Sequence, residues 1–153
     1  MKFKQSLLKT DIGNLLLTFS DEGIHTIQFN AKDGDVIFEQ SDKNQYVDQL
    51  EEYFLGKRKS FDFPFILVGT PFQVSVWKYI QKIPFGKTQT YKEIAEGIEH
   101  TGSSRAVGNA LHVNPIPIVI PCHRVIRSDG GLGGFGGGIH LKQKLLEFEK
   151  EHV

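Results

Sequence analysis

Residues 115–125 read PIPIVIPCHRV. Three prolines exclude a helix, so we expect an extended apolar segment that ends at the chain's one cysteine, Cys122. A nucleophilic thiol needs a nearby base or positive charge, and His123 and Arg124 could supply both. Because neighbours on a strand point to opposite faces, a Cys–His relay requires the chain to bend or turn helical at Cys122. The alternative from the residues alone is a buried structural thiol.

Downstream of this segment, the sequence indicates a loop and then a helix. Seven of the nine residues from Gly130 to Gly138 are glycine, which predicts a very flexible loop. Between His140 and about Lys150, apolar residues recur at helical spacing, so the chain should end in a helix with one buried face.

Upstream, the sequence predicts three helices. Thr70-Pro71 can start one, since threonine caps and proline fits the first helical position, and it should run to Ile83-Pro84. Thr90 and Glu93 have capping-box spacing and open a short helix to about residue 98. Another covers 103–112. Two short helices joined by a glycine-containing turn are typical of a helix-turn-helix, although most such pairs are only packing units.

The first 68 residues differ in character. Residues 12–19 and 24–29 flank a turn signal and predict a hairpin, residues 44–55 have helical spacing, and 61–65 form a candidate short strand. We therefore predict an α+β protein. Residues 1–68 form an α/β lobe with a small antiparallel sheet, and residues 69–153 form a mostly helical lobe that contains the helix-turn-helix.

The charge and composition of the chain bear on its binding partner and on its location in the cell. The net charge is zero, but residues 1–68 carry 8 basic and 11 acidic side chains, whereas residues 69–153 carry 10 and 7. A polyanionic partner would therefore bind the C-terminal half. No apolar run approaches the roughly 20 residues that cross a bilayer, and no signal peptide is evident. A single cysteine allows no internal disulfide and no thiolate cluster for zinc, which favours a cytoplasmic location, or a nuclear one in a eukaryote.

The chain resembles the O6-alkylguanine-DNA alkyltransferases over about Pro71 to Glu149. The motifs that carry the resemblance are, in order, Phe72 with Val76-Trp77, Ile83-Pro84-Phe85-Gly86-Lys87-Thr88, Tyr91 with Ile94-Ala95, Arg105-Ala106-Val107-Gly108, Asn114-Pro115 and Pro121-Cys122-His123-Arg124-Val125. The resemblance implies direct-reversal DNA repair by irreversible transfer of an alkyl group from O6-alkylguanine onto Cys122. Whether O4-alkylthymine is also a substrate is left open by the sequence. The resemblance also implies a monomer that binds double-stranded DNA and needs no cofactor.

The same resemblance implies roles for the reacting groups. Cys122 is similar to the acceptor nucleophile, and His123 to a base that takes the thiol proton through water. Glu149 falls where a carboxylate orients that histidine, a role that fixes the imidazole tautomer. Tyr91 resembles the residue that donates a proton or hydrogen bond to the departing guanine.

Further residues resemble the DNA-binding and pocket positions. Arg105 is similar to the arginine that replaces the flipped nucleotide in the duplex, since a base buried in the stack must be extruded before it can react. The helix that follows resembles one laid in the minor groove. The implied DNA contacts are Ser104, Arg105, Ala106, Gly108, Ala110 and Arg124. The implied pocket residues are Asn114, which ties the helix pair to the cysteine segment, and Phe135 and Gly136, which belong to the loop over the substrate.

Three other functions remain open at this point. A non-catalytic sensor of alkylation damage would flip the base without reacting, but such relatives replace the cysteine. A helix-turn-helix regulator would keep its cysteine for structure, and a Cys–His hydrolase would turn over a thioester or peptide.

Overall fold

The computed structural model describes residues 2–153. The chain divides into two compact units, Met1–Leu67 and Val68–Val153.

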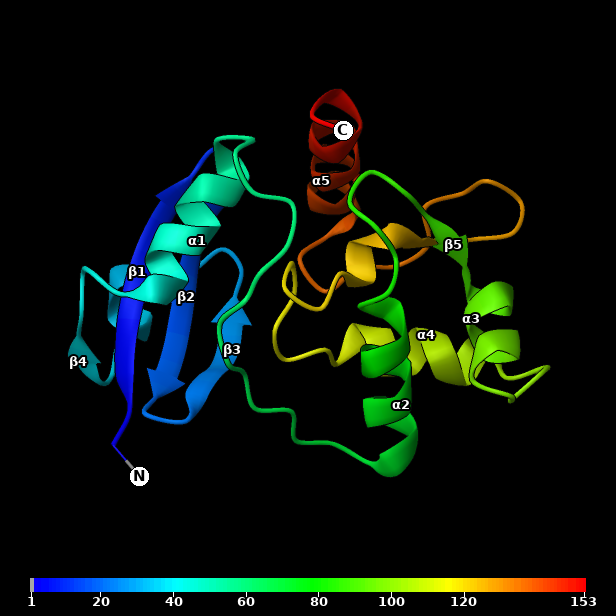
Figure 1. The fold of residues 1–153 in the computed structure, drawn as a ribbon, viewed down its shortest axis with the longest axis horizontal. Helices are drawn as coiled ribbons and strands as arrows, with labels where there is room; N and C mark the ends of the chain where they lie inside the picture. The colour runs from blue at the N-terminus through cyan, green and yellow to red at the C-terminus, as the bar shows by residue number, and fades with distance from the viewer. Residues whose placement is uncertain (1) are drawn as a thin grey trace. The chain divides into compact units, whose positions relative to one another are not determined.

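Unit 1 is a four-stranded sheet with one helix (Figure 1). Its elements are β1 (Lys4–Thr10), β2 (Gly13–Ser20), β3 (Gly23–Gln28), the 3₁₀ turn η1 (Asp33–Asp35), β4 (Glu39–Gln40) and α1 (Gln45–Phe54). The strand order is β3-β2-β1-β4; β1, β2 and β3 are antiparallel, and β4 runs parallel to β1. The predicted hairpin and helix are therefore confirmed, while the predicted strand at 61–65 is reduced to one bridge between Phe65 and Ile24.

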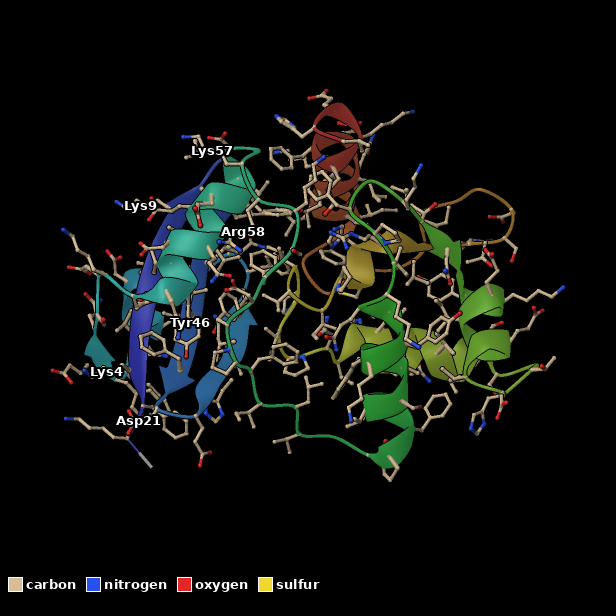
Figure 2. The ribbon with its side chains drawn as sticks, in the orientation of Figure 1. Lys4, Lys9, Asp21, Tyr46, Lys57 and Arg58 are labelled. Carbon is tan, nitrogen blue, oxygen red and sulfur yellow. The ribbon has the colours of Figure 1, made fainter. Side chains whose placement is uncertain are left out.

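Aromatic residues and leucines hold α1 on this sheet. The helix begins after Asn44, whose side-chain oxygen accepts a hydrogen bond from the Val47 amide at 3.0 Å. Leu50 is fully buried. The ring of Tyr46, which is labelled in Figure 2, lies 4.9 Å from that of Phe19 on β2. Burying each such side chain contributes about 1.5–3 kcal/mol relative to leaving it in water.

Unit 2 is built mainly from helices. Its elements are α2 (Pro71–Ile80), β5 (Gln89–Thr90), α3 (Tyr91–Gly97), α4 (Ser104–His112), the 3₁₀ turn η2 (Cys122–Arg124), β6 (Val125–Ile126) and α5 (Ile139–Glu151). The predicted helices are confirmed to within a few residues, and α2, α3 and α4 pack on one another.

Local capping explains where these helices start. Thr70 and Gln73 form a capping box at α2, and Thr90 and Glu93 form another at α3. The α2–α4 contact has a specific centre at Trp77, which is 1% exposed. Its indole N–H donates to the carbonyl of Ala110 on α4 at 2.9 Å, so the buried polar edge of the ring is paired.

The proline-rich segment is a turn instead of the extended run that the sequence predicted. The Ile120 amide donates to the Ile116 carbonyl at 2.9 Å, and Ile118 has a φ of 75°. Three prolines do exclude a helix, but they are compatible with tight turns as well as with strands. The result is a compact apolar plug, buried from Ile116 to Ile120, that ends at Cys122.

Candidate active site

A cavity of about 820 Å³ opens on Cys122 and lies wholly within unit 2. Its walls come from α3, α4, η2 and the glycine-rich loop. The residues that line it are Tyr91, Ser104, Arg105, Gly108, Asn109, Leu111, His112, Cys122, Arg127, Gly133, Gly134 and Phe135. A cavity of this size holds a drug-sized ligand, and it brings the predicted nucleophile together with Tyr91, Arg105 and Phe135.

The thiol of Cys122 is held in a 3₁₀ turn, the helical bend that a Cys–His relay requires. Burial raises the pKa of this thiol to about 11, although a hydrogen bond with Asn114 and the charge of Lys142 work in the other direction. Asn114 also bonds the surrounding turn, donating to the Ile120 carbonyl at 2.8 Å. The resting group is therefore a neutral thiol, and it must lose its proton when it reacts.

A buried histidine and carboxylate stand next to it. His123 Nε2 lies 2.7 Å from Glu149 Oε2, and the two side chains are 0% and 1% exposed. Burial disfavours the charged carboxylate, but the hydrogen bonds and charge of His123 and Arg124 hold the pKa of Glu149 far below its usual range. An ionised Glu149 accepts a hydrogen bond from the Nε2–H of His123, which leaves Nδ1 as the unprotonated, basic nitrogen. Nδ1 is buried and has no hydrogen-bond partner within residues 2–153.

Arg124 lies inside unit 2, so its expected contact with DNA is wrong. It is 5% exposed, and its Nε and Nη2 donate to the two oxygens of Glu149 at 2.8 and 2.9 Å. A third donor, Nη1, reaches the Ile83 carbonyl at 2.7 Å. The 3₁₀ turn aims this side chain inward, where it fixes the carboxylate that holds His123.

Tyr91 is placed by strand pairing. It begins α3 directly after Thr90, and β5 pairs in parallel with β6 so that Thr90 is opposite Ile126. Burial raises the pKa of Tyr91, and Cys122 in its thiolate form raises it further, although Arg127 counteracts them. The Tyr91 hydroxyl therefore keeps a proton that it can donate. The ring also packs against Gly133, where a β-carbon would lie 2.9 Å from Tyr91 Cε2.

The first turns of α4 form another wall. Ser104, Arg105 and Gly108 line the cavity, and Ala106 is exposed beside them. Ala110 does not belong to this surface, because it is 2% exposed and faces Trp77. Its predicted DNA contact is therefore wrong, because the C-terminal half of α4 packs on α2 at Trp77.

The glycine-rich loop contributes Gly133, Gly134 and Phe135 to the cavity. Gly136 follows Phe135 and is exposed; a β-carbon there would lie 3.6 Å from the His112 carbonyl, in ordinary contact. The loop thus approaches the end of α4 closely through its backbone.

The sequence reasoning missed Lys142 on α5. This side chain is fully buried, and its ammonium donates to the Val125 carbonyl at 2.6 Å and the Gly134 carbonyl at 3.4 Å. It also lies 5.7 Å from the Tyr91 ring centroid. Burial lowers the pKa of Lys142 to about 8. Its position seven residues before Glu149, two helical turns away on the same face, is the signal that could have found it.

Comparisons with known proteins extend over both units. Residues 71–151 match the DNA binding domain of 6-O-methylguanine DNA methyltransferase, and residues 3–67 match the ribonuclease-like domain of the same proteins. The chain belongs to the 6-O-methylguanine DNA methyltransferase family. Within it, a methylated-DNA–protein-cysteine methyltransferase of Methanosarcina barkeri is 42% identical over 153 residues, which cover 96% of this chain and 97% of the relative.

Solved members of the family share the fold. The OGT of Mycobacterium tuberculosis in complex with DNA superposes with a TM-score of 0.90 at 39% identity, covering 98% of this chain and 94% of that one. The O6-methylguanine-DNA methyltransferase of Pyrococcus kodakaraensis gives a TM-score of 0.75 at 26% identity, covering 96% and 98%. The predicted α+β class is confirmed. In the described part of the chain, no helix has the length and apolar character needed to cross a membrane.

Proposed function

We propose that this chain repairs alkylated DNA by accepting the alkyl group of O6-alkylguanine on Cys122. The observation that carries the proposal is the cavity at Cys122, backed by the buried His123–Glu149 pair. Membership of the family and the DNA complex of the M. tuberculosis relative support the choice of substrate.

The reaction is a displacement at the alkyl carbon. A bond forms between Cys122 Sγ and that carbon while the bond from the carbon to guanine O6 breaks, and the electron pair leaves with guanine. Because the resting thiol pKa is about 11, the thiol proton must leave as the sulfur attacks, and His123 Nδ1 is the base that we assign to accept it, through water. Tyr91, which stays protonated, would donate a hydrogen bond to the departing guanine.

On the DNA side, we propose that α4 enters the minor groove with Ser104, Ala106 and Gly108 against its walls. Arg105, which is exposed at the first turn of α4 and lines the cavity, would fill the space of the extruded nucleotide. Residues 69–153 would then act as the DNA-binding and alkyl-acceptor domain, and residues 1–68 as a separate α/β lobe.

The test is label transfer from duplex DNA that carries radiolabelled O6-methylguanine. The wild-type chain should gain one methyl group per molecule and then stop, since its sequence has no second cysteine to regenerate the thiol. Cys122→Ala should bind the same duplex and gain no label. More than one methyl transferred per chain would contradict single-turnover transfer to Cys122, and binding without label by the wild type would support the damage sensor. Turnover of a thioester or peptide by an unlabelled wild type would support the hydrolase alternative. A strong preference among unmodified sequences would support the regulator.

A further inference from the structure

A cation that the mechanism does not use, Arg127, lines the same cavity. Its position follows from the parallel pair β5–β6. Thr90 is opposite Ile126, so the next residues, Tyr91 and Arg127, emerge at the same end of the two strands. Arg127 therefore approaches the cavity from β6, whereas Arg105 approaches it from α4.

The charged side chains that line the cavity are all basic. They are Arg105 and Arg127, and none of the described residues that line the cavity carries a carboxylate. The positive charge of Arg127 acts to lower the pKa of Tyr91, although burial and Cys122 outweigh it, so this charge is felt at the reacting end of the cavity. Such a wall attracts an anion that accompanies the substrate.

A short turn keeps Arg127 in place. Its Nη2 donates to Asp129 Oδ2 at 2.7 Å, and the other oxygen of Asp129 accepts from the Gly131 amide at 2.9 Å. Backbone bonds between Arg127 and residues 130 and 131 close the turn. The Arg127–Asp129 pair is more than half exposed, so it is weak and can be exchanged for a better partner.

A phosphate is a stronger partner for Arg127 than the exposed carboxylate of Asp129. Guanidinium binds phosphate through two parallel hydrogen bonds, and these charge-assisted bonds are stronger than an exposed ion pair. A nucleotide whose base enters the cavity keeps its phosphates outside it, in solvent, and Arg127 is both a residue of the cavity wall and exposed to solvent. A free alkylated base carries none.

We propose that Arg127 binds a phosphate next to the sugar of the nucleotide whose base occupies the cavity, and so favours nucleotides over free bases and nucleosides. This proposal rests on the alkyl transfer proposed above. In the free protein, Asp129 orients the guanidinium through its ion pair with Arg127, and this pair breaks when the phosphate binds.

Small substrates test this without the many contacts of duplex binding. The single-turnover rate constants would be compared for O6-benzyl-2′-deoxyguanosine and its 5′- and 3′-monophosphates. One of the monophosphates should react roughly tenfold faster than the nucleoside, the effect of one hydrogen-bonded charge pair. In Arg127→Ala that ratio should fall to about one, in Arg127→Lys it should be intermediate, and in Asp129→Asn it should rise. Lys92→Ala removes an exposed lysine of α3 outside the cavity and should leave the ratio unchanged.

The outcomes separate the two proposals. If the wild type accepts no benzyl group from any of the three compounds, the alkyl transfer itself fails. If it reacts with all three at equal rates, or if Arg127→Ala keeps the advantage of the monophosphate, the phosphate contact is wrong. Equal losses on nucleoside and monophosphate in Arg127→Ala would also overturn it, because Arg127 would then act through Tyr91.

Discussion

At Cys122, burial and reactivity oppose one another. Burial raises the pKa of the Cys122 thiol to about 11, yet only the thiolate is a good nucleophile. Asn114 and Lys142 offset part of this effect, and His123 presents a basic nitrogen with no protein partner in the described chain. At neutral pH the thiol is therefore protonated and weakly nucleophilic.

The contact between Gly133 and Tyr91 gives a prediction at this scale. In Gly133→Ala the new β-carbon would overlap the Tyr91 hydroxyl and ring, so Tyr91 must move. The rate of transfer from O6-benzylguanine should then fall roughly 100-fold, the low end of the loss for one removed hydrogen-bond donor. Gly130→Ala is a matched control, because Gly130 also has a positive φ (89°, against 76° at Gly133) but a β-carbon there meets no atom within 4 Å. Equal rates in the two variants would show that backbone strain, not Tyr91, is responsible.

Among the elements, α5 carries two buried charged side chains on one face. Lys142 contacts the ring of Tyr91, and Glu149 forms a hydrogen bond with His123. Glu149 accepts hydrogen bonds from His123, Arg124 and the Gly86 amide. The helix therefore contacts both His123 and Tyr91, the residues that we propose as base and proton donor, although none of its own residues lines the cavity.

Glu149 also links stability to pH. Its folded pKa lies below the ordinary value of 4.5, so its contribution is present above about pH 4.5 and is lost as the pH falls through the folded value. Glu149→Gln should lower the free energy of unfolding by about 3 kcal/mol at neutral pH, because it leaves Arg124 buried without a charged partner. Urea unfolding at several pH values measures this.

The difference between wild type and Glu149→Gln should shrink below pH 4.5, and a gap that stays constant down to strongly acidic pH would contradict the linkage. Glu147→Gln, an exposed change two residues earlier on α5, is the control and should cost within about 0.5 kcal/mol.

Elements with local signals could be predicted, and those set by distant contacts could not. The starts of α2 and α3 are encoded by Thr70 and Thr90 within four residues of sequence. The two-residue strands β5 and β6 depend on pairing 36 residues apart in sequence, which no local pattern reveals. The direction of a side chain was the weakest inference: Arg124 and Ala110 both point inward because of packing that follows from the tertiary fold.

For the whole molecule, the division into two units has a consequence for the site. Every residue that lines the cavity, together with His123, Glu149 and Lys142, lies in Val68–Val153. That unit has its own buried core, which includes Val76, Ile80, Ile94, Ile116 and Leu145. The net charge also differs between the two parts of the chain, because residues 69–153 carry more basic than acidic side chains.

We therefore predict that a fragment of residues 68–153 folds and accepts a benzyl group from O6-benzylguanine at a rate within about tenfold of the full chain, as expected of a domain with its own core. Mass spectrometry of the fragment after reaction and its circular dichroism measure this. A fragment that folds but stays unmodified would show that residues 1–67 contribute to the reaction, and the same fragment with Cys122→Ala is the blank.

The hydrogen bond from Trp77 to the Ala110 carbonyl makes Trp77 an intrinsic fluorescence probe of the position of α4. Trp77 is the single tryptophan of the sequence, is almost completely buried, and is attached to the helix that carries Arg105. Tryptophan emission shifts to longer wavelength when the indole meets water, so any movement of α4 away from α2 should appear as a red shift without a label. Movements of the helix on substrate binding can thus be timed by stopped-flow fluorescence in the unmodified protein.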